Sequence, residues 1–262
     1  MSTHRPPWPD TSGRTIYAVG DVHGRDDLLA RMLTLIEQDA QAHIPHGRPM
    51  IVLLGDYIDR GRHAPRVLDR LAALQADRRF ETRLLLGNHE EAMIDMIDGR
   101  TTGRGWRRYG GDATMEAYGV RAPGPDEDDS AWHTARAGLA AAVPAHHMAL
   151  LRGLELAVQV GEVVFVHAGL RPGVPLGEQA REDLIGIRGA FLDAERGDGP
   201  FVVHGHTPVA TCDYRPDRLN LDTGACLTGR LSGARLDGGE PAILTASAMG
   251  MQVRPVSLAC AA

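Results

Sequence analysis

Several features that define other classes of protein are missing from this sequence. The longest apolar runs, such as Met50 to Leu54, reach only a few residues, well below the roughly 20 that a membrane-spanning helix needs. Lys and Arg form no stripe, and Asp and Glu outnumber them by 34 to 28, so the electrostatic pattern of a duplex-binding protein is missing. We therefore expect neither a membrane nor a nucleic acid duplex as a partner.

Cysteine is scarce and shows no metal-binding pattern. Cys212, Cys226 and Cys260 are odd in number and lack the spacing of a metal motif, which fits reduced thiols. The first eight residues contain no apolar segment after His4 and Arg5, so we expect no secretory signal. These features favour a cytoplasmic protein.

What is present is a globular composition with a strong α/β pattern in its first third. The 262 residues are 43% hydrophobic and 24% charged, which is enough apolar material for a full core. Short β-rich runs alternate with amphipathic helical segments, as in βαβ units. We expect strands at 15–19, 50–54 and 82–86, and helices at 26–42 and from Pro65 onward.

The middle of the chain differs from both ends. Residues from about 90 to 151 carry helical and loop signals, and we expect them to form an inserted helical cap. The β character then returns at 154–160 and 163–166, a predicted hairpin, and continues in short strands at 201–203, 219–222, 227–236 and 242–253. We find no internal repeat, and we expect residues 1–262 to form one domain with an insertion.

Short polar clusters follow the predicted strands, at the edge of an α/β sheet where ligands bind. Asp21, Asp56 and Asn88 are separated by about one βαβ unit each, so adjacent strands can place them side by side. Carboxylate, imidazole and amide groups together form the ligand set for a pair of borderline divalent metals. The clusters are Gly20-Asp21-Val22-His23-Gly24, Gly55-Asp56-Tyr57-Ile58-Asp59-Arg60-Gly61, Gly87-Asn88-His89-Glu90, His167-Ala168-Gly169 and His204-Gly205-His206-Thr207.

Asp56, in the middle of the three strand ends, is well placed to bridge two ions. Water held between two metals about 3.5–4 Å apart becomes hydroxide near neutral pH and can attack phosphorus in line. Each cluster taken singly has a simpler interpretation. Asp21 could cap a helix, Asp59 and Arg60 could form a surface ion pair, and Glu90 could satisfy a helix dipole. The order, placement and shared chemistry of the whole set favour the metal site.

Three of these blocks, GDVHG at 20–24, GDYIDRG at 55–61 and GNHE at 87–90, resemble the signature of the phosphoprotein phosphatase type of calcineurin-like metallophosphoesterases. The resemblance extends from Ile16 to about Arg235 and is closest to the small bacterial and bacteriophage lambda-type protein phosphatases. It implies an α/β fold with a central two-sheet β-sandwich flanked by helices. The segments 106–119, 183–192 and 222–225 also look like the bacterial branch.

The resemblance implies a role for each matching residue. His89 matches the general acid, Asp59 the carboxylate that orients it, and Arg60 and Arg188 the arginines that hold the phosphoryl oxygens. His204 stands where many eukaryotic members carry Arg, so its role stays open. Two divalent ions are implied, Mn²⁺ with Fe or Zn as alternatives, one held by Asp21, His23 and Asp56 and the other by Asp56, Asn88, His167 and His206.

The chemistry of the residues agrees with these roles. A serine alkoxide is a strong base and needs a proton from an acid, and pairing with Asp59 raises the pKa of an imidazolium at His89. The guanidinium of Arg60 offers the planar fork that phosphate oxygens prefer.

We expect hydrolysis of phosphoserine or phosphothreonine on proteins. The alternatives are hydrolysis of dinucleoside polyphosphates such as diadenosine tetraphosphate, and a module that binds a phosphorylated ligand without catalysis. The catalytic centre does not separate the two enzymes. Residues 106–109, Trp-Arg-Arg-Tyr, could either contact the substrate beyond its phosphate or anchor the insert. The sequence gives no indication of the oligomeric state.

Overall fold

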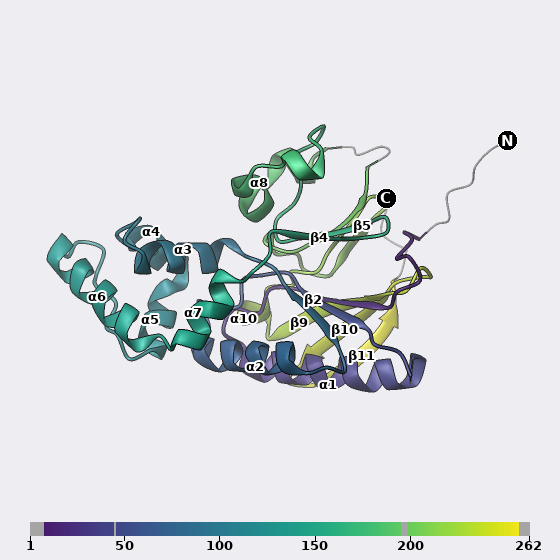
Figure 1. The fold of residues 1–262 in the computed structure, drawn as a ribbon, viewed down its shortest axis with the longest axis horizontal. Coiled ribbons are helices and arrows are strands. Elements are labelled where there is room, and N and C mark those ends of the chain that lie inside the picture. Colours follow the sequence, from purple (N-terminus) through teal and green to yellow (C-terminus); the bar gives the residue numbers. More distant parts are fainter. Residues whose placement is uncertain (1–7, 45, 195–198, 257–262) are drawn as a thin grey trace.

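The computed structural model describes residues 8–44, 46–194 and 199–256, so His4, Arg5 and Cys260 lie outside the described residues. Two β-sheets pack face to face with helices on their outer sides (Figure 1), which confirms the expected α/β architecture. The six-stranded sheet has the order β11 (Gly250–Pro255), β10 (Ala242–Ser247), β9 (Arg230–Leu236), β1 (Ile16–Val19), β2 (Met50–Leu53), β3 (Glu81–Leu84). The five-stranded sheet has the order β4 (Ala157–Val160), β5 (Val163–Val166), β6 (Phe201–His204), β8 (Arg218–Asn220), β7 (Asp213–Arg215).

Alternating side chains along the strands build two hydrophobic layers. Ile16 and Val52 point into the layer between the sheets, which also contains Phe165 from β5. Tyr17 and Ile51 point the other way, into the larger cluster that the helices cover. The helices that follow β1 and β2 lie along this outer side (Figure 1), namely α1 (Asp26–His43) and α2 (Ala64–Ala76).

Strand direction explains why one edge of the sandwich collects polar residues. Strands β1, β2 and β3 run parallel to one another, and so do β5, β6 and β8 in the other sheet. The carboxyl ends of parallel strands lie at the same edge of a sheet, where ligands bind. The fold therefore brings six loop starts from two sheets toward one place.

The segment between β3 and β4 is helical, as expected for the cap. It lies beyond one end of the two sheets (Figure 1) and includes a segment, η1, in which Gly110, with a φ of 100°, kinks the helical backbone. The elements are α3 (Asn88–Ile97), α4 (Arg104–Trp106), η1 (Arg107–Gly111), α5 (Asp112–Ala117), α6 (Asp129–Ala142) and α7 (Ala145–Arg152). Short helical turns elsewhere are η2 (Leu176–Glu178), α8 (Arg181–Gly186), α9 (Gly189–Leu192) and α10 (Ala225–Thr228).

The later strands differ from the expectation in three places. The expected strand at 227–236 begins as α10 and becomes β9 only after Gly229, whose positive φ of 68° ends the helix. The expected strand at 242–253 is a hairpin of two strands, β10 and β11. Strand β7 was not expected, because three residues are too few to show a periodic pattern.

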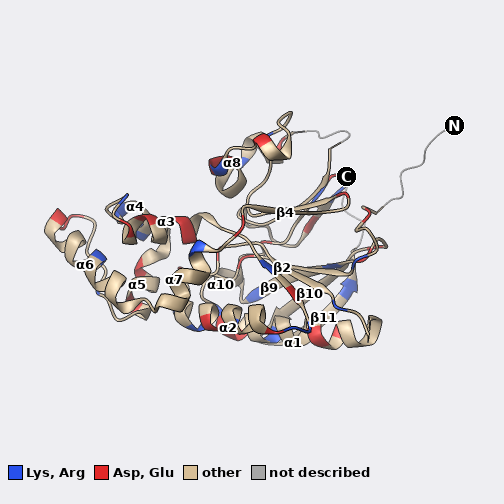
Figure 2. Ribbon diagram, in the orientation of Figure 1, with Lys and Arg blue, Asp and Glu red and all other residues tan. Residues whose placement is uncertain are grey.

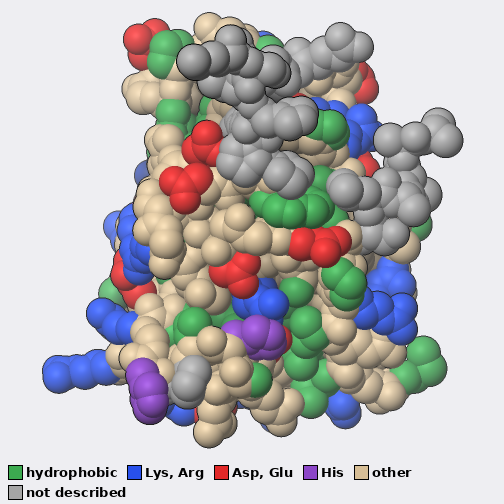
Figure 3. Space-filling view, turned by 90° about the vertical axis from the view of Figure 1, so that its right-hand side faces the viewer, with side chains coloured by type: hydrophobic (Ala, Val, Ile, Leu, Met, Phe, Trp, Pro, Cys, Tyr) green, Lys and Arg blue, Asp and Glu red, His purple; other side chains and the backbone are tan. Residues whose placement is uncertain are grey.

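Acidic and basic side chains are interspersed along the helices and strands (Figure 2). One end of the molecule, seen face on in Figure 3, likewise mixes acidic, basic and hydrophobic side chains. Within the described residues, no helix is long and apolar enough to span a bilayer, and Cys212 and Cys226 are both free thiols.

A buried polar contact fastens α1 to the six-stranded sheet. Asp39 of α1 accepts hydrogen bonds from the hydroxyl of Tyr17 on β1, at 2.6 Å, and from Nη1 of Arg235 on β9, at 2.7 Å. Only 5% of the Asp39 side chain and 13% of the Arg235 side chain are exposed. Removing one partner of a buried ion pair leaves the other partner uncompensated.

We therefore expect Asp39→Ala to lower the free energy of unfolding by about 3 kcal/mol. Urea denaturation followed by circular dichroism measures the change. Glu37→Ala is the matched control, because Glu37 lies on the same helix in an exposed ion pair with Arg79 and should cost at most about 1 kcal/mol. Equal losses in the two variants would contradict a special role for the buried contact.

Candidate active site

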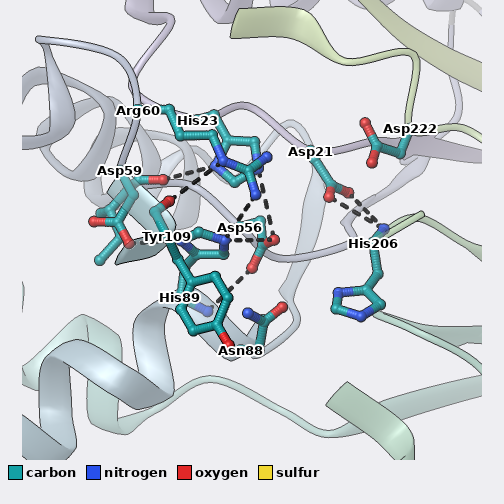
Figure 4. Close-up of polar contacts among 12 residues, drawn as sticks. Asp21, His23, Asp56, Asp59, Arg60, Asn88, His89, Tyr109, His206 and Asp222 are labelled. Atoms are coloured by element: carbon teal, nitrogen blue, oxygen red, sulfur yellow. Dashed lines mark hydrogen bonds and ion pairs between the residues drawn. The ribbon is translucent and has the colours of Figure 1, made fainter. Parts of the chain in front are cut away.

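Polar side chains from both sheets converge at the common edge of the parallel strands, and Figure 4 shows most of them. Each of these side chains follows a different parallel strand directly. In strand order β1, β2, β3, β5, β6 and β8 they are Asp21, Asp56, Asn88, His167, His206 and Asp222. His23 lies two residues after Asp21. The structure thus brings together every residue proposed as a metal ligand.

Asp56 lies at the centre of this group. Its carboxylate belongs to two clusters of ligand atoms, one with His23 and His89 and one with His167 and His206. The atoms of each cluster lie within 4.8 Å of one another. Burial would raise the pKa of Asp56, but the neighbouring charges of His167 and His89 bring it well below the ordinary value. A single carboxylate shared by two clusters is the arrangement that a bridging ligand needs.

The histidines of the two clusters are turned so that Nε2 faces the centre. Nδ1 of His23 lies 2.9 Å from the carbonyl of Ile58, and Nδ1 of His167 lies 2.8 Å from the carbonyl of Leu54. A carbonyl only accepts, so Nδ1 carries a proton, and Nε2 is the nitrogen that would present a lone pair to a metal, as in metal-ligating histidines. Nε2 of His206 is buried without a hydrogen-bond partner. This donor set fits divalent metal ions.

Two carboxylates beside these histidines have little around them to offset their negative charge. Asp21 accepts a hydrogen bond of 3.1 Å from the backbone N–H of His206. Burial, with the nearby charges of Asp222 and Asp56, raises the pKa of Asp21 well above its ordinary value. Burial also raises the pKa of Asp222. A bound cation would stabilise the charged form of both groups. Asp222 was not among the predicted ligands, although the Asp-Thr-Gly-Ala block at 222–225 was noted.

His89 is oriented by Asp59. The Nδ1 atom of His89 lies 2.6 Å from Oδ2 of Asp59, and its Nε2 lies 3.7 Å from Oδ2 of Asp56. Burial would lower the pKa of His89, but the charges of Asp56 and Asp59 and the hydrogen bond to Asp59 raise it to about 9. The ring is therefore held with Nδ1 toward Asp59 and Nε2 toward the centre of the site.

The helical insert completes the surroundings of Asp59. Nε1 of Trp106 donates to Oδ2 of Asp59 at 2.6 Å, and Oγ1 of Thr114 donates to Oδ1 at 2.6 Å. Trp106 is buried, with 3% exposed, whereas Tyr109 is 59% exposed. Trp106 therefore anchors the insert to the site, and Tyr109 stays open to solvent. The role of Thr114 was not predicted, because no local pattern links it to a residue 55 positions earlier.

Arg60 does not form the simple surface ion pair with Asp59 that its position in the sequence suggested. Its Nη1 lies 2.7 Å from Nε2 of His23, and its Nη2 lies 3.3 Å from Nε2 of His89 (Figure 4). The guanidinium thus lies against the ring nitrogens that face the centre, and Nη1 is close to the Nε2 atom of His23 that a metal would bind. Arg188 is also exposed and donates to Oγ1 of Thr207 at 3.1 Å, next to His206.

Glu90 has a structural role that exceeds the expected dipole effect. Its buried carboxylate accepts from the backbone N–H of Asp56 at 2.9 Å, of Tyr57 at 2.8 Å and of Gly87 at 3.1 Å. It therefore joins the loop after β2 to the loop after β3. The signal was present in the sequence as the last residue of the GNHE block.

His204 lies outside the group of converging side chains. It is buried and packs edge-on against Phe191, with ring centroids 5.0 Å apart. Burial lowers the pKa of His204 to about 4. The structure therefore assigns it to packing.

The backbone of the site is strained. Among the described non-glycine residues six have positive φ, and five of these belong to the site: His23, Asp56, Asp59, Arg60 and His206. Such residues cost roughly 1–3 kcal/mol each and concentrate at functional sites. The strain indicates that the surrounding structure fixes these side chains in place.

Comparisons with known proteins agree with this geometry. The family model described as calcineurin-like phosphoesterase matches residues 14–232. The bis(5'-nucleosyl)-tetraphosphatase PrpE (asymmetrical) of Anoxybacillus flavithermus is 25% identical over 239 residues, which cover 83% of this chain and 88% of the relative.

Solved structures share the fold at low sequence identity. A protein provisionally named a diadenosine tetraphosphatase aligns with a TM-score of 0.60 at 20% identity, covering 92% of this chain and 96% of the other. A serine/threonine phosphatase from Saccharomyces cerevisiae with similarity to human phosphatase PP5 aligns with a TM-score of 0.54 at 14% identity, covering 96% and 87%. Since the family model spans most of the sequence, this chain belongs to the calcineurin-like phosphoesterase family of metal-dependent hydrolases.

Proposed function

We propose that the protein hydrolyses dinucleoside polyphosphates of the diadenosine tetraphosphate class with two divalent metal ions. The observation that carries the metal-dependent step is Asp56, whose carboxylate is shared by two clusters of ligand atoms. The substrate class is supported by a relative named as a bis(5'-nucleosyl)-tetraphosphatase that aligns over 83% of this chain. This choice replaces the protein phosphatase activity favoured from the sequence.

The metal ions would be held by the six residues that the sequence proposed. Their mixture of carboxylate, imidazole and amide groups suits Mn²⁺, Fe or Zn better than Mg²⁺. When bound, the ions lower the pKa of water and neutralise phosphate charge. We assign Asp21, His23 and Asp56 to one ion, and Asp56, Asn88, His167 and His206 to the other. This assignment is supported by the two clusters that share Asp56 and by the contacts of Asn88 with His167 and of Asp21 with His206.

The arginines and His89 act on the substrate itself. The guanidinium of Arg60 can hold two phosphoryl oxygens at once, because its fork is planar and faces the site. Arg188, on the other side of His206, offers a second cation. His89, oriented by Asp59, is placed to donate a proton to a leaving oxygen, which matters most where that oxygen is strongly basic.

Tyr109 gives the site a feature suited to a nucleotide. Its exposed ring lies at the entrance beside His89, with ring centroids 6.2 Å apart (Figure 4). Stacking of a base on an aromatic side chain contributes about 1–3 kcal/mol. Arg107 and Arg108 directly precede it in the same segment, η1. The ring can therefore hold a nucleobase while the phosphate chain reaches the metal site.

A second candidate is hydrolysis of phosphoserine or phosphothreonine on proteins. The observation that favours it is the His89 and Asp59 pair. The alkoxide of serine is a strong base and needs a proton donor, whereas a leaving phosphate is already a stable anion. A chain that only binds phosphorylated ligands would not need this acid.

The substrate class is tested by comparing kcat/KM on diadenosine tetraphosphate, a phosphoserine peptide and p-nitrophenyl phosphate. We expect the dinucleotide to be the best substrate, activity to be lost on chelation, and Mn²⁺ to restore it better than Mg²⁺. Tyr109→Ala should raise KM for the dinucleotide about tenfold, because base stacking is lost, and leave p-nitrophenyl phosphate unchanged. A phosphopeptide preference that Tyr109→Ala leaves intact would favour the second candidate.

The acid is tested by His89→Asn. We expect metal content to be retained and kcat on phosphoserine to fall by roughly 10²–10⁴-fold, the usual contribution of a general acid. The loss on p-nitrophenyl phosphate should be smaller, because its leaving phenolate is stable near neutral pH. Metal content is measured on the same preparation. Equal losses with metals retained would argue against proton donation, and loss of a metal would make His89 a ligand.

The positioning role of the insert is tested by Trp106→Phe, which keeps most of the buried ring and removes the hydrogen bond to Asp59. We expect kcat on phosphoserine to fall about tenfold, with a smaller effect on p-nitrophenyl phosphate. Trp132→Phe is the matched control, because Trp132 is also buried and its Nε1 has no hydrogen-bond partner. If the two variants behave alike, Trp106 serves packing alone.

A further inference from the structure

A third cluster of ligand atoms lies outside the active site and shares no residue with it. Asp69 of α2 and His146 and His147 of α7 place one carboxylate oxygen and two imidazole nitrogens within 4.8 Å of one another. Nε2 of His146 lies 3.1 Å and Nε2 of His147 lies 2.9 Å from the same oxygen, Oδ1 of Asp69. Helices α2 and α7 are neighbours in the fold (Figure 1).

The side chains of this cluster are set up for coordination. His147 is buried, with 1% of its side chain exposed, and its Nδ1 lies 2.8 Å from the hydroxyl of Tyr118. A carboxylate oxygen only accepts, so Nε2 of His147 donates to Asp69 in this structure and the Tyr118 hydroxyl donates to Nδ1. If a metal took the place of the proton on Nε2, Nδ1 could donate to the same hydroxyl, which would then be a second-sphere partner that fixes the ring. The ring of His146 lies beside it, with centroids 4.3 Å apart. Two of the three proposed ligands are therefore consecutive residues, and the ring of one of them, His147, is already held by burial and by Tyr118.

The exposure of the other two groups leaves room for solvent. The side chains of His146 and Asp69 are 58% and 60% exposed. Three protein ligands with an open side toward water match the coordination of zinc sites that keep a water molecule in the fourth position. Two imidazoles and one carboxylate favour a borderline ion over the hard ions Mg²⁺ and Ca²⁺.

We propose that Asp69, His146 and His147 bind a single zinc ion that ties the helical insert to the core of the protein. Helix α2 belongs to the βαβ part of the chain, whereas α7 is the last helix of the insert and leads back into β4. Tyr118 follows α5 of the same insert. A metal at this point therefore links three helical elements that are held together in the described structure by hydrogen bonds to Asp69 and by apolar packing.

The proposal is tested with the full chain loaded with Mn²⁺ and then equilibrated with equimolar zinc. Total metal per chain, counted by elemental analysis after gel filtration, is independent of any exchange within the active site. We expect the wild-type protein to hold one more ion per chain than His146→Ala and Asp69→Asn. His133→Ala is the matched control, because His133 is an exposed histidine on the neighbouring α6 and should hold the same number as the wild type.

Tyr118→Phe tests whether the hydrogen bond from Tyr118 to His147 contributes to zinc binding. Loss of an outer partner typically weakens a metal site by about 10–100-fold, so the zinc dissociation constant from equilibrium dialysis should rise by that factor. Zinc should also raise the melting temperature of the wild type and not that of His146→Ala, while activity on p-nitrophenyl phosphate stays the same in both. Equal metal content in the wild type and in both ligand variants overturns the proposal. Unchanged affinity in Tyr118→Phe overturns the assigned outer partner.

Discussion

Negative charge buried at one point is the constraint on which the rest of this structure depends. Asp21, Asp56, Asp59 and Glu90 are all nearly or fully buried within neighbouring loops, and a buried carboxylate is costly unless it is paired or hydrogen-bonded. Asp59 and Glu90 are stabilised by hydrogen bonds from side chains and backbone, and Asp56 by the histidines around it. Asp21, beside Asp222, has the least compensation. The charge that the protein leaves uncompensated is the charge that divalent ions would neutralise.

The backbone of the site follows from the same constraint. A side chain at Gly205 would collide with Oδ1 of Asp21, and one at Gly87 would collide with Oδ1 of Asp56. The glycines thus make room for the protein's own carboxylates. Positive φ at Asp56 and His206 turns the chain just after a strand, where an extended backbone would carry these side chains away. Glu90, by binding the loop N–H groups after two strands, supplies part of the free energy that holds the strained turns.

The sequence predicted the strands of the βαβ region and the polar residues that converge after them, because both depend on local patterns. Apolar runs that end in a polar pair mark strand ends, and parallel strands bring those ends together. It did not predict the contacts made across the chain. Thr114 and Asp222 lie in segments without any local sign of a partner, and Trp106 had two equal interpretations until its bond to Asp59 was known. Contacts between residues that are far apart in the sequence cannot be predicted from local patterns in a single sequence.

The position of the insert suggests how catalysis and substrate choice are kept separate. Its buried side, through Trp106 and Thr114, fixes the carboxylate that orients His89, so changes there alter the acid itself. Its open side carries Tyr109, whose ring lies edge-on to the ring of His89 (Figure 4). A substitution on the open side can therefore change which group is held beyond the phosphate, while the hydrogen bonds of Asp59 stay intact. A kink at Gly110, where φ is 100°, interrupts the helical backbone of the insert just after Tyr109. Trp106 lies on the buried side of this segment, with 3% exposed, and Tyr109 lies on the open side, with 59% exposed.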